Sequence, residues 1–174
     1  GGAMIVTDVQ SLMDLDANDI TLTASTGNMT VTLVNAGTTD GDVNLTATAG
    51  AIVDGTGAPN VTGDVLTAVA PNGIELDTAI NCLAATAIGA GADITIRESN
   101  ALGLLLVTAS DLVTLTLTAG AITDKNAASN NVNAVNLVMT GPAGIGAGTD
   151  AIETTVNNLE ATGGTGGVYL VNTG

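Results

Sequence analysis

Apolar and polar residues alternate with a period of two along most of the chain. The alternation is clearest in Ile-Thr-Leu-Thr at 20–23, Met-Thr-Val-Thr-Leu at 29–33, Ile-Thr-Ile at 94–96 and Val-Thr-Leu-Thr-Leu-Thr at 113–118. Such a pattern places successive side chains on opposite faces of a pleated strand. Clusters of Gly, Asn and Asp separate these segments and favour tight turns. The pattern predicts an all-β chain built from short strands.

The chain also repeats itself. The phrase LTATAGAIVD at 45–54 returns as LTLTAGAITD at 115–124, and residues 43–74 align with 113–145 at an offset of 70 or 71. A fixed period of this length is typical of an array of structural repeats. The leucines that open the phrase and its looser relatives recur mostly about every 22 residues: Leu22, Leu45, Leu66, Leu83, Leu115, Leu137 and Leu159.

A unit of about 20 residues with two or three short strands cannot bury its apolar side alone, so it must stack on its neighbours. We therefore predict a parallel β-helix of 7 or 8 turns, which at about 4.8 Å per turn gives a rod roughly 35 to 40 Å long. A β-propeller blade needs about 40 to 50 residues, and an immunoglobulin-like sandwich would lack its core Trp and Cys pair. We expect Leu45 to stack on Leu66, and Leu137 on both Leu115 and Leu159, with Ile52 and Ile122 buried at equivalent places.

The domain organisation follows from the same repeats. Residues 1–4, Gly-Gly-Ala-Met, are typical of a cloning scar, and residues 5–174 are interpreted as a single β-helix segment. Its two related units lie near 43–111 and 113–174. Both ends break off in repeat-like sequence, so we expect the chain to be a piece of a longer protein.

Composition narrows the possible partners. The chain is 45% hydrophobic with a net charge of −15, whereas disordered acidic segments have low hydrophobicity. Arg97 and Lys125 are its two cations, too few to neutralise a run of phosphates, so we expect neither nucleic acid nor an anionic lipid surface as a partner. The longest apolar run, 101–107, is too short to cross a bilayer, so no membrane insertion is expected.

The residues needed for catalysis are sparse. Histidine is absent, which excludes nucleophile–His catalysis. A β-helical polysaccharide hydrolase or lyase would use paired carboxylates, or Ca²⁺ with cationic residues, in an aromatic cleft. Only one aromatic residue, Tyr169, and one arginine are present. We predict a non-enzyme with no catalytic, cofactor-binding or metal-ligating residues and no cofactor.

Two segments partly resemble calcium-binding loops. Asp40-Gly-Asp42-Val-Asn44 begins like such a loop, but Leu45 and Ala51 occupy positions that require Gly and Glu. Gly89 to Ile94 matches part of a β-roll nonapeptide that occurs here once. We interpret both as solvated turns, which leaves weak binding of Ca²⁺ by the acidic surface open. Cys82 is the single cysteine, and we expect a free, partly buried thiol.

Outward threonines suggest one further function. On a flat solenoid face they could form a hydroxyl lattice of the ice-binding kind. Two points argue against an ice-binding lattice. The threonine pairs are unevenly spaced along the sequence, and Thr is a favoured outward residue on any strand. The threonines concerned are Thr21 and Thr23, Thr30 and Thr32, Thr46 and Thr48, and Thr114, Thr116 and Thr118.

The order of these motifs resembles a known family. Residues 73–124, GIELDTAINCLAATAIGAGADITIRESNALGLLLVTASDLVTLTLTAGAITD, are similar to repeats of large bacterial exoproteins of the filamentous-haemagglutinin type. The resemblance implies a right-handed β-helix in a secreted or cell-surface adhesin, where it serves as a stalk or scaffold. It also implies flanking repeats of the same chain and a glycan or protein on a host or neighbouring cell as partners.

The family supplies no binding residues. A β-helical carbohydrate-binding or carbohydrate-cleaving domain is the alternative, and an ice-binding solenoid comes after it. If a ligand loop exists, the irregular stretch from Gly89 to Asp111 is its expected place.

Overall fold

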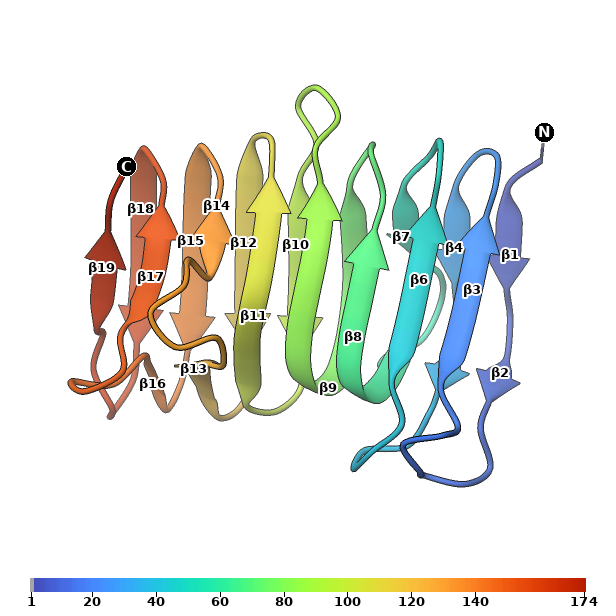
Figure 1. Cartoon of the computed structure of the whole chain (residues 1–174), viewed down its shortest axis with the longest axis horizontal. Coiled ribbons are helices and arrows are strands. Elements are labelled where there is room, and N and C mark those ends of the chain that lie inside the picture. Colours follow the sequence, from blue (N-terminus) through green and yellow to red (C-terminus); the bar gives the residue numbers. More distant parts are fainter. Residues whose placement is uncertain (1) are drawn as a thin grey trace.

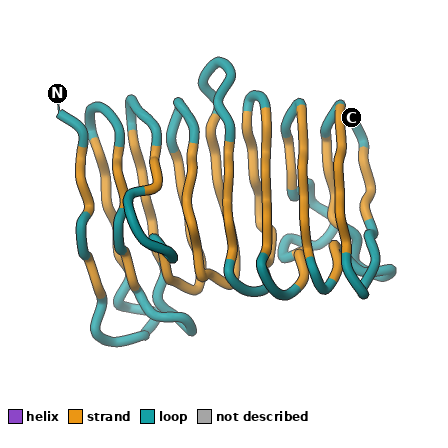
Figure 2. Tube along the Cα trace, turned by 180° about the vertical axis from the view of Figure 1, so that it is seen from behind, coloured by secondary structure: helices purple, strands orange, loops and turns teal. Residues whose placement is uncertain are grey.

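Nineteen strands form one continuous sheet that winds into a coil, in a computed structural model that describes residues 2–174. Every pairing between named strands is parallel, and an isolated bridge between Ala147 and Asp150 is antiparallel. The described residues contain strands, turns and loops but no helix (Figure 2). The prediction of an all-β parallel β-helix is confirmed.

Each turn passes through three faces, because corners or loops bend the chain between strands. Face 1 consists of β1 (Met4–Val6), β4 (Met29–Val31), β7 (Ile52–Asp54), the start of β9 (Ile74–Ala87), β10 (Ile94–Glu98), β12 (Leu112–Leu117), β15 (Asn136–Gly141) and β18 (Asn158–Gly163). Face 2 consists of β2 (Val9–Gln10), β5 (Val34–Asn35), the start of β8 (Val61–Val69), the middle of β9, the start of β11 (Leu102–Ala109), β13 (Ala121–Asp124) and β16 (Gly144–Ile145). Face 3 consists of β3 (Ile20–Ala24), β6 (Val43–Ala47), the ends of β8, β9 and β11, then β14 (Val132–Asn133), β17 (Ile152–Thr155) and β19 (Leu170–Asn172).

The coil is right-handed, as predicted. In Figure 1 the strands of face 3 run upward in front and those of face 1 run downward behind, while the chain advances from right to left. Parallel strands joined by crossovers nearly always take this hand. One row of register partners on face 1 marks eight turns, with steps of 19 to 25 residues: Met4, Met29, Ile52, Ile74, Ile94, Val113, Leu137 and Leu159.

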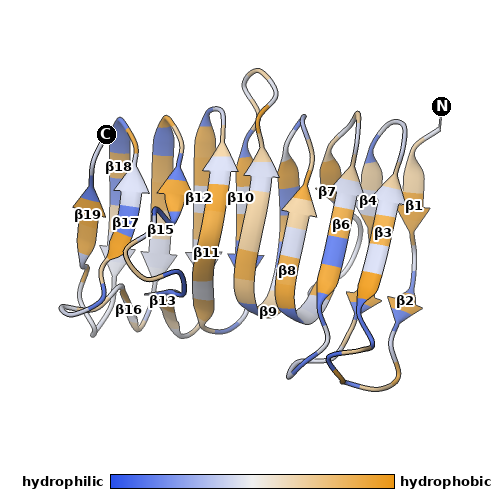
Figure 3. Cartoon of the chain, in the orientation of Figure 1, coloured by the Kyte–Doolittle hydropathy of each residue, from blue (hydrophilic) through white to orange (hydrophobic). Residues whose placement is uncertain are grey.

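The core is a stack of such rows. Apolar and polar bands alternate along many strands (Figure 3), so alternate residues enter the interior. Ile52 and Ile122 are both fully buried, as predicted. The interior is narrow and is filled by Ala, Val, Ile, Leu and Met.

Two of the three predicted leucine stacks are wrong by two residues. Leu45 aligns with Ala68, not with Leu66, and Leu115 aligns with Met139, not with Leu137. Leu137 does align with Leu159. A period of two fixes which side of a strand faces inward but cannot detect a shift of two residues. The lengths of the corners determine the register.

The longer loops project from the corners (Figure 2). The stretch from Gly89 to Asp111, expected to be irregular, instead contains β10 and β11, and only the short loop 88–93 projects from it. Other loops span 11–19, 36–42, 55–60, 125–131 and 146–151. Of the four residues interpreted as a cloning scar, Gly1 lies outside the described residues, and Met4 begins β1 and pairs with Met29.

Loop 11–19 is held against loop 36–42 by one side chain. The carboxylate of Asp14 accepts hydrogen bonds from the backbone N–H groups of Thr38, Thr39, Asp40 and Gly41, at 2.9 to 3.2 Å. The bond from Asp40 has the largest effect, and together these bonds lower the pKa of Asp14 far below its usual value.

Candidate functional site

Four charged side chains from three successive turns meet on face 1, near the C-terminal ends of its strands in the middle of the rod. The Arg97 guanidinium on β10 lies 2.8 Å from a carboxylate oxygen of Glu75 and 2.8 Å from one of Asp77, both on β9. Its other contact, at 3.7 Å, is Asp54 at the end of β7. Arg97 and Asp77 are register partners, so the parallel ladder itself brings them together. We call Asp54, Glu75, Asp77 and Arg97 the Arg97 cluster.

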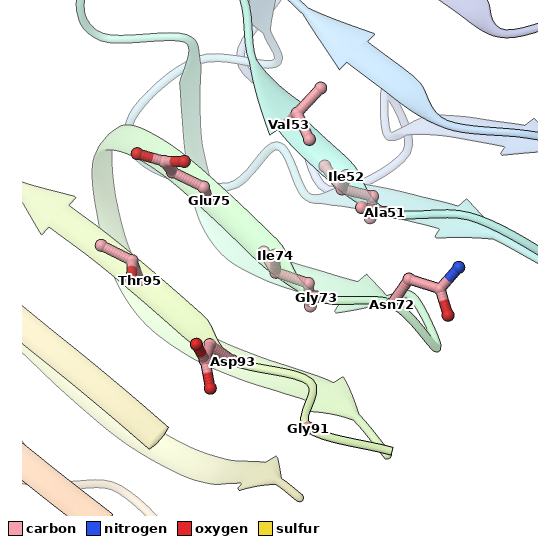
Figure 4. A pocket seen from close by; sticks show the side chains of 10 residues that line it. All are labelled: Ala51, Ile52, Val53, Asn72, Gly73, Ile74, Glu75, Gly91, Asp93 and Thr95. Carbon is pink, nitrogen blue, oxygen red and sulfur yellow. The ribbon is translucent and has the colours of Figure 1, made fainter. Parts of the chain in front are cut away.

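A shallow hollow of about 260 Å³ lies on one side of the Arg97 cluster. Its walls are three stretches that lie side by side on successive turns (Figure 4). The carboxylates of Glu75 and Asp93 line it together with the Asn72 amide and the Thr95 hydroxyl. The surface of this hollow is therefore rich in hydrogen-bond acceptors.

A second hollow of about 280 Å³ lies where loop 55–60 approaches the corner after β10. Ala58 and Pro59 form one wall, and Asp77, Arg97 and Thr118 are among the residues that complete it. Arg97 and Asp77 therefore belong to the cluster and also line this hollow. The Arg97 cluster therefore lies between the two hollows, with Glu75 lining the first and Asp77 and Arg97 lining the second.

The corner beneath this region is held by a buried carboxylate. Glu98 is fully buried, and one of its oxygens accepts hydrogen bonds from the Thr78 hydroxyl at 2.7 Å and from the Ile80 N–H at 3.1 Å. The other oxygen accepts bonds from the N–H groups of Ser99 at 2.6 Å and Asn100 at 3.0 Å. Each oxygen of this buried carboxylate therefore accepts hydrogen bonds from two donors. These bonds offset the cost of burying the carboxylate and hold the corner in place.

The side chains of the Arg97 cluster can bind a partner through hydrogen bonds. Its three carboxylates outnumber its one guanidinium, so the region is net acidic and suits partners that donate hydrogen bonds, such as sugar hydroxyls. The described residues contain no group of three or more His, Cys, Asp or Glu side chains arranged to hold a metal ion.

The residues considered for calcium are engaged in structural bonds, both Asp42, which lies away from the cluster, and Asp93, which lines the first hollow. Asp42 accepts a hydrogen bond from the Val65 N–H, and Asp93 accepts one from the Leu112 N–H. Burial raises the pKa of Asp42, and the neighbouring carboxylates of Asp19 and Asp64 raise it further. Neither calcium-like segment forms a closed ligand loop.

Cys82 is a free, partly buried thiol, as expected. Burial raises its pKa, and the nearby carboxylate of Asp64 raises it further. A raised pKa disfavours the reactive thiolate.

The sequence pattern missed the Arg97 cluster, although a signal was present. Asp54, Glu75 and Arg97 are spaced by 21 and 22 residues, about one turn of the predicted coil. Charged residues one turn apart on a solenoid fall next to each other. Their opposite signs at that spacing could have indicated an ion-pair ladder.

The threonines named from the sequence are divided between two faces: Thr23 and Thr46 are neighbours on face 3, whereas Thr30, Thr114 and Thr116 lie on face 1. The face 3 column that contains the first two holds six threonines in all, interrupted by Val69 and Asn133. The six are Thr23, Thr46, Thr86, Thr108, Thr155 and Thr173, the last two joined by a 3.0 Å hydroxyl contact.

Comparison with known proteins adds no identification: the chain matches no family model, no curated protein and no solved structure. Among the described residues, no helix is long and apolar enough to cross a membrane. Function must therefore be argued from the geometry alone.

Proposed function

We propose that this chain is a non-enzymatic scaffold segment of a secreted or surface-exposed bacterial adhesin. The observation that supports the proposal is the unbroken ladder: eight turns are joined by parallel pairing, with a continuous apolar core. A rod of this kind holds two points about 35 to 40 Å apart. Its stiffness comes from register-locked strands, which resist bending because each contacts both neighbours.

The polar groups in its interior support the same role. Fully buried Asn60 and Asn131 each bond to the backbone one turn along, and Glu98 is satisfied by four residues of its own corner and the adjacent turn. Buried polar groups that are fully paired stiffen a structure. They serve the scaffold and are not exposed to a ligand.

The experiment combines activity and stability. The 174-residue chain is incubated with acidic and neutral polysaccharides, with and without Ca²⁺, and products are followed by reducing-end release and by absorbance of unsaturated sugars. We expect no turnover and a melting temperature that EDTA leaves unchanged. Turnover of any glycan, or a melting temperature that collapses in EDTA, would refute the scaffold proposal.

A carbohydrate-binding domain is the second candidate, and the Arg97 cluster between its two hollows favours it. Oligosaccharides titrated into the chain by calorimetry test this candidate. Binding that is lost in Arg97→Ala and kept in Lys125→Ala, which removes the other cation, would support it. If no binding is detected at millimolar sugar, the carbohydrate-binding candidate is refuted and the scaffold proposal remains.

A further inference from the structure

Face 3 carries a broad uncharged surface on a strongly acidic chain. On the five turns from β3 to β11, three outward columns contain fifteen residues, and none of them is charged. We call these residues the face 3 patch: Thr21, Thr23, Ser25, Asn44, Thr46, Thr48, Thr67, Val69, Pro71, Ala84, Thr86, Ile88, Leu106, Thr108 and Ser110.

The exposed side chains of the face 3 patch include three large aliphatic ones among the hydroxyls. Ile88 is 67% exposed, Leu106 46% and Val69 40%, large fractions for aliphatic side chains in the middle of a rod. The Thr48 hydroxyl at the edge of the patch donates to the Ser25 carbonyl at 2.8 Å, so this hydroxyl is already satisfied within the chain. Exposed aliphatic side chains gathered on one uncharged face are typical of interaction sites.

The same patch has both a projection and a hollow. Leu106 lies next to the register shift between Leu104 and Leu106, where β11 bulges against β9. A hollow of about 350 Å³ lies two turns away, and its walls include Val69, Pro71 and Ile88. A projection and a hollow on one surface are what a twofold interface requires, because each copy then offers both to the other.

We propose that the face 3 patch is the surface through which a second copy of this chain packs, with Leu106 of each copy seated against the hollow of the other. This inference goes beyond the scaffold role. Electrostatic repulsion disfavours the other surfaces, because each chain carries a net charge of −15. Contact through the Arg97 cluster, or through the loops that carry Asp14, Asp42 and Asp64, would place carboxylates of one copy against carboxylates of the other. The fifteen residues of the face 3 patch bring no charged side chain into such a contact.

The size of the patch sets the strength expected. Five turns by five residues measure about 24 by 16 Å, so two such surfaces together cover about 770 Å². That area is below that of a standard specific interface, so we expect a weak, reversible dimer. Salt should strengthen it, since screening removes the repulsion between two acidic chains while leaving apolar contact intact.

Sedimentation equilibrium of the whole 174-residue chain tests the inference, with Cys82 kept reduced and salt at about 10 mM or about 500 mM. We expect a dimer whose dissociation constant falls at high salt. The double variant Leu106→Glu/Ile88→Glu should weaken dimerisation at least about tenfold, a loss of about 1.4 kcal/mol or more. Thr123→Glu/Ser129→Glu, which adds the same two negative charges at exposed positions on face 2 and in the loop after it, is the control and should stay within about twofold of the parent. Circular dichroism confirms that each variant is folded.

Three outcomes would overturn the inference. One is a chain that stays monomeric to millimolar concentration at both salts. Another is open-ended growth beyond dimers that the Leu106→Glu/Ile88→Glu variant leaves unchanged, which would assign association to the ends of the rod. The third is a chain that stays monomeric and binds a glycan or ice, with binding lost in Leu106→Glu/Ile88→Glu. That result would show that the face 3 patch binds a different partner.

Discussion

Leu45 and Leu115 open the two most similar phrases of the sequence, yet they lie on different faces of the coil. Leu45 belongs to β6 on face 3 and pairs with Leu22, whereas Leu115 belongs to β12 on face 1 and pairs with Ile96. Each phrase crosses one corner, at Gly50 in the first copy and at Gly120 in the second. The offset of 70 residues therefore spans three turns and one further face, so the unit that repeats in the sequence is a corner.

The loops that follow these corners repeat in the same way. Asn60 precedes β8, and its backbone N–H and side-chain oxygen bind the C=O and N–H of Asp77. Asn131 precedes β14 and makes the same two bonds to Glu153. Because the two asparagines are 71 residues apart, corner, loop and buried Asn form one transferable module.

Replacing Asn131 with Ala should lower the free energy of unfolding by about 1 to 3 kcal/mol, because it leaves the Glu153 N–H without its acceptor and removes the bond that the Asn131 amide donates to the Asp124 carboxylate. Urea unfolding followed by circular dichroism measures the loss. Asn133→Ala, which alters an exposed outward residue two positions on, should change it by less than about 0.5 kcal/mol. Equal losses in both variants would contradict a special role for Asn131.

The fold could be predicted from the sequence because a solenoid depends on local rules. Alternation in segments such as 113–118 determines which residues point inward, and the recurring corner determines that turns stack. The register could not be predicted in full: Leu66 pairs with Val43 because this turn is 23 residues long, whereas Leu45 and Leu66 are 21 residues apart. Corner length depends on loop geometry, which a period of two does not encode.

No local motif encodes the Arg97 cluster, because its members come from three turns; only the spacing of its charges, about one turn, points to it. Asp54, Glu75 and Arg97 become neighbours only when the length of each turn is known. Glu98 was equally hidden, since alternation places it inside an apolar row next to Ile96. Only its hydrogen-bond partners explain why a carboxylate is tolerated there.

A charge in an inward row should be strongly destabilising. Leu115→Asp places an unpaired carboxylate in the core and should cost about 3 to 5 kcal/mol. Thr116→Asp introduces the same side chain at the next, outward position of β12 and should cost less than about 1 kcal/mol. Thermal unfolding of both variants distinguishes them. A similar melting temperature for the pair would show that the inward assignment of Leu115 is wrong.

Glu98→Gln should destabilise the corner after β10. The amide replaces one acceptor oxygen with an NH₂ group, which must face the N–H groups of Ser99 and Asn100 or the donors Thr78 and Ile80. We expect a loss of about 2 kcal/mol in urea unfolding, since bonds to a charged acceptor are the stronger kind. Glu75→Gln on the exposed side should lose at most about 1 kcal/mol. A Glu98→Gln variant as stable as the parent would show that the second carboxylate oxygen of Glu98 does not stabilise this corner.

The attachment of loop 11–19 should persist in acid. The pKa of Asp14 is lowered in the folded chain, so its contribution to stability is complete above the ordinary pKa of an Asp and is lost only as pH falls through the lower folded value. Amide exchange at Thr38 to Gly41 should therefore remain slow, after correction for intrinsic rates, at a pH where free Asp is half protonated. Asp14→Asn should already exchange faster at neutral pH. Protection that disappears near pH 4 would contradict the lowered pKa.

Arg97 should act mainly by neutralising its neighbours, so its removal should be felt most at low salt. In Arg97→Ala, Asp54, Glu75 and Asp77 repel one another without compensation. Because Arg97 is 42% exposed, solvent screens the pairs and we expect a loss of about 1 kcal/mol at about 10 mM salt, most of it recovered at about 500 mM. Arg97→Lys keeps the charge but not the planar fork that reaches two carboxylates at once, so it should restore part of the loss. Urea titrations of the three proteins at both salts give the comparison. A deficit in Arg97→Ala that is independent of salt would instead assign the role of Arg97 to packing of its aliphatic stem.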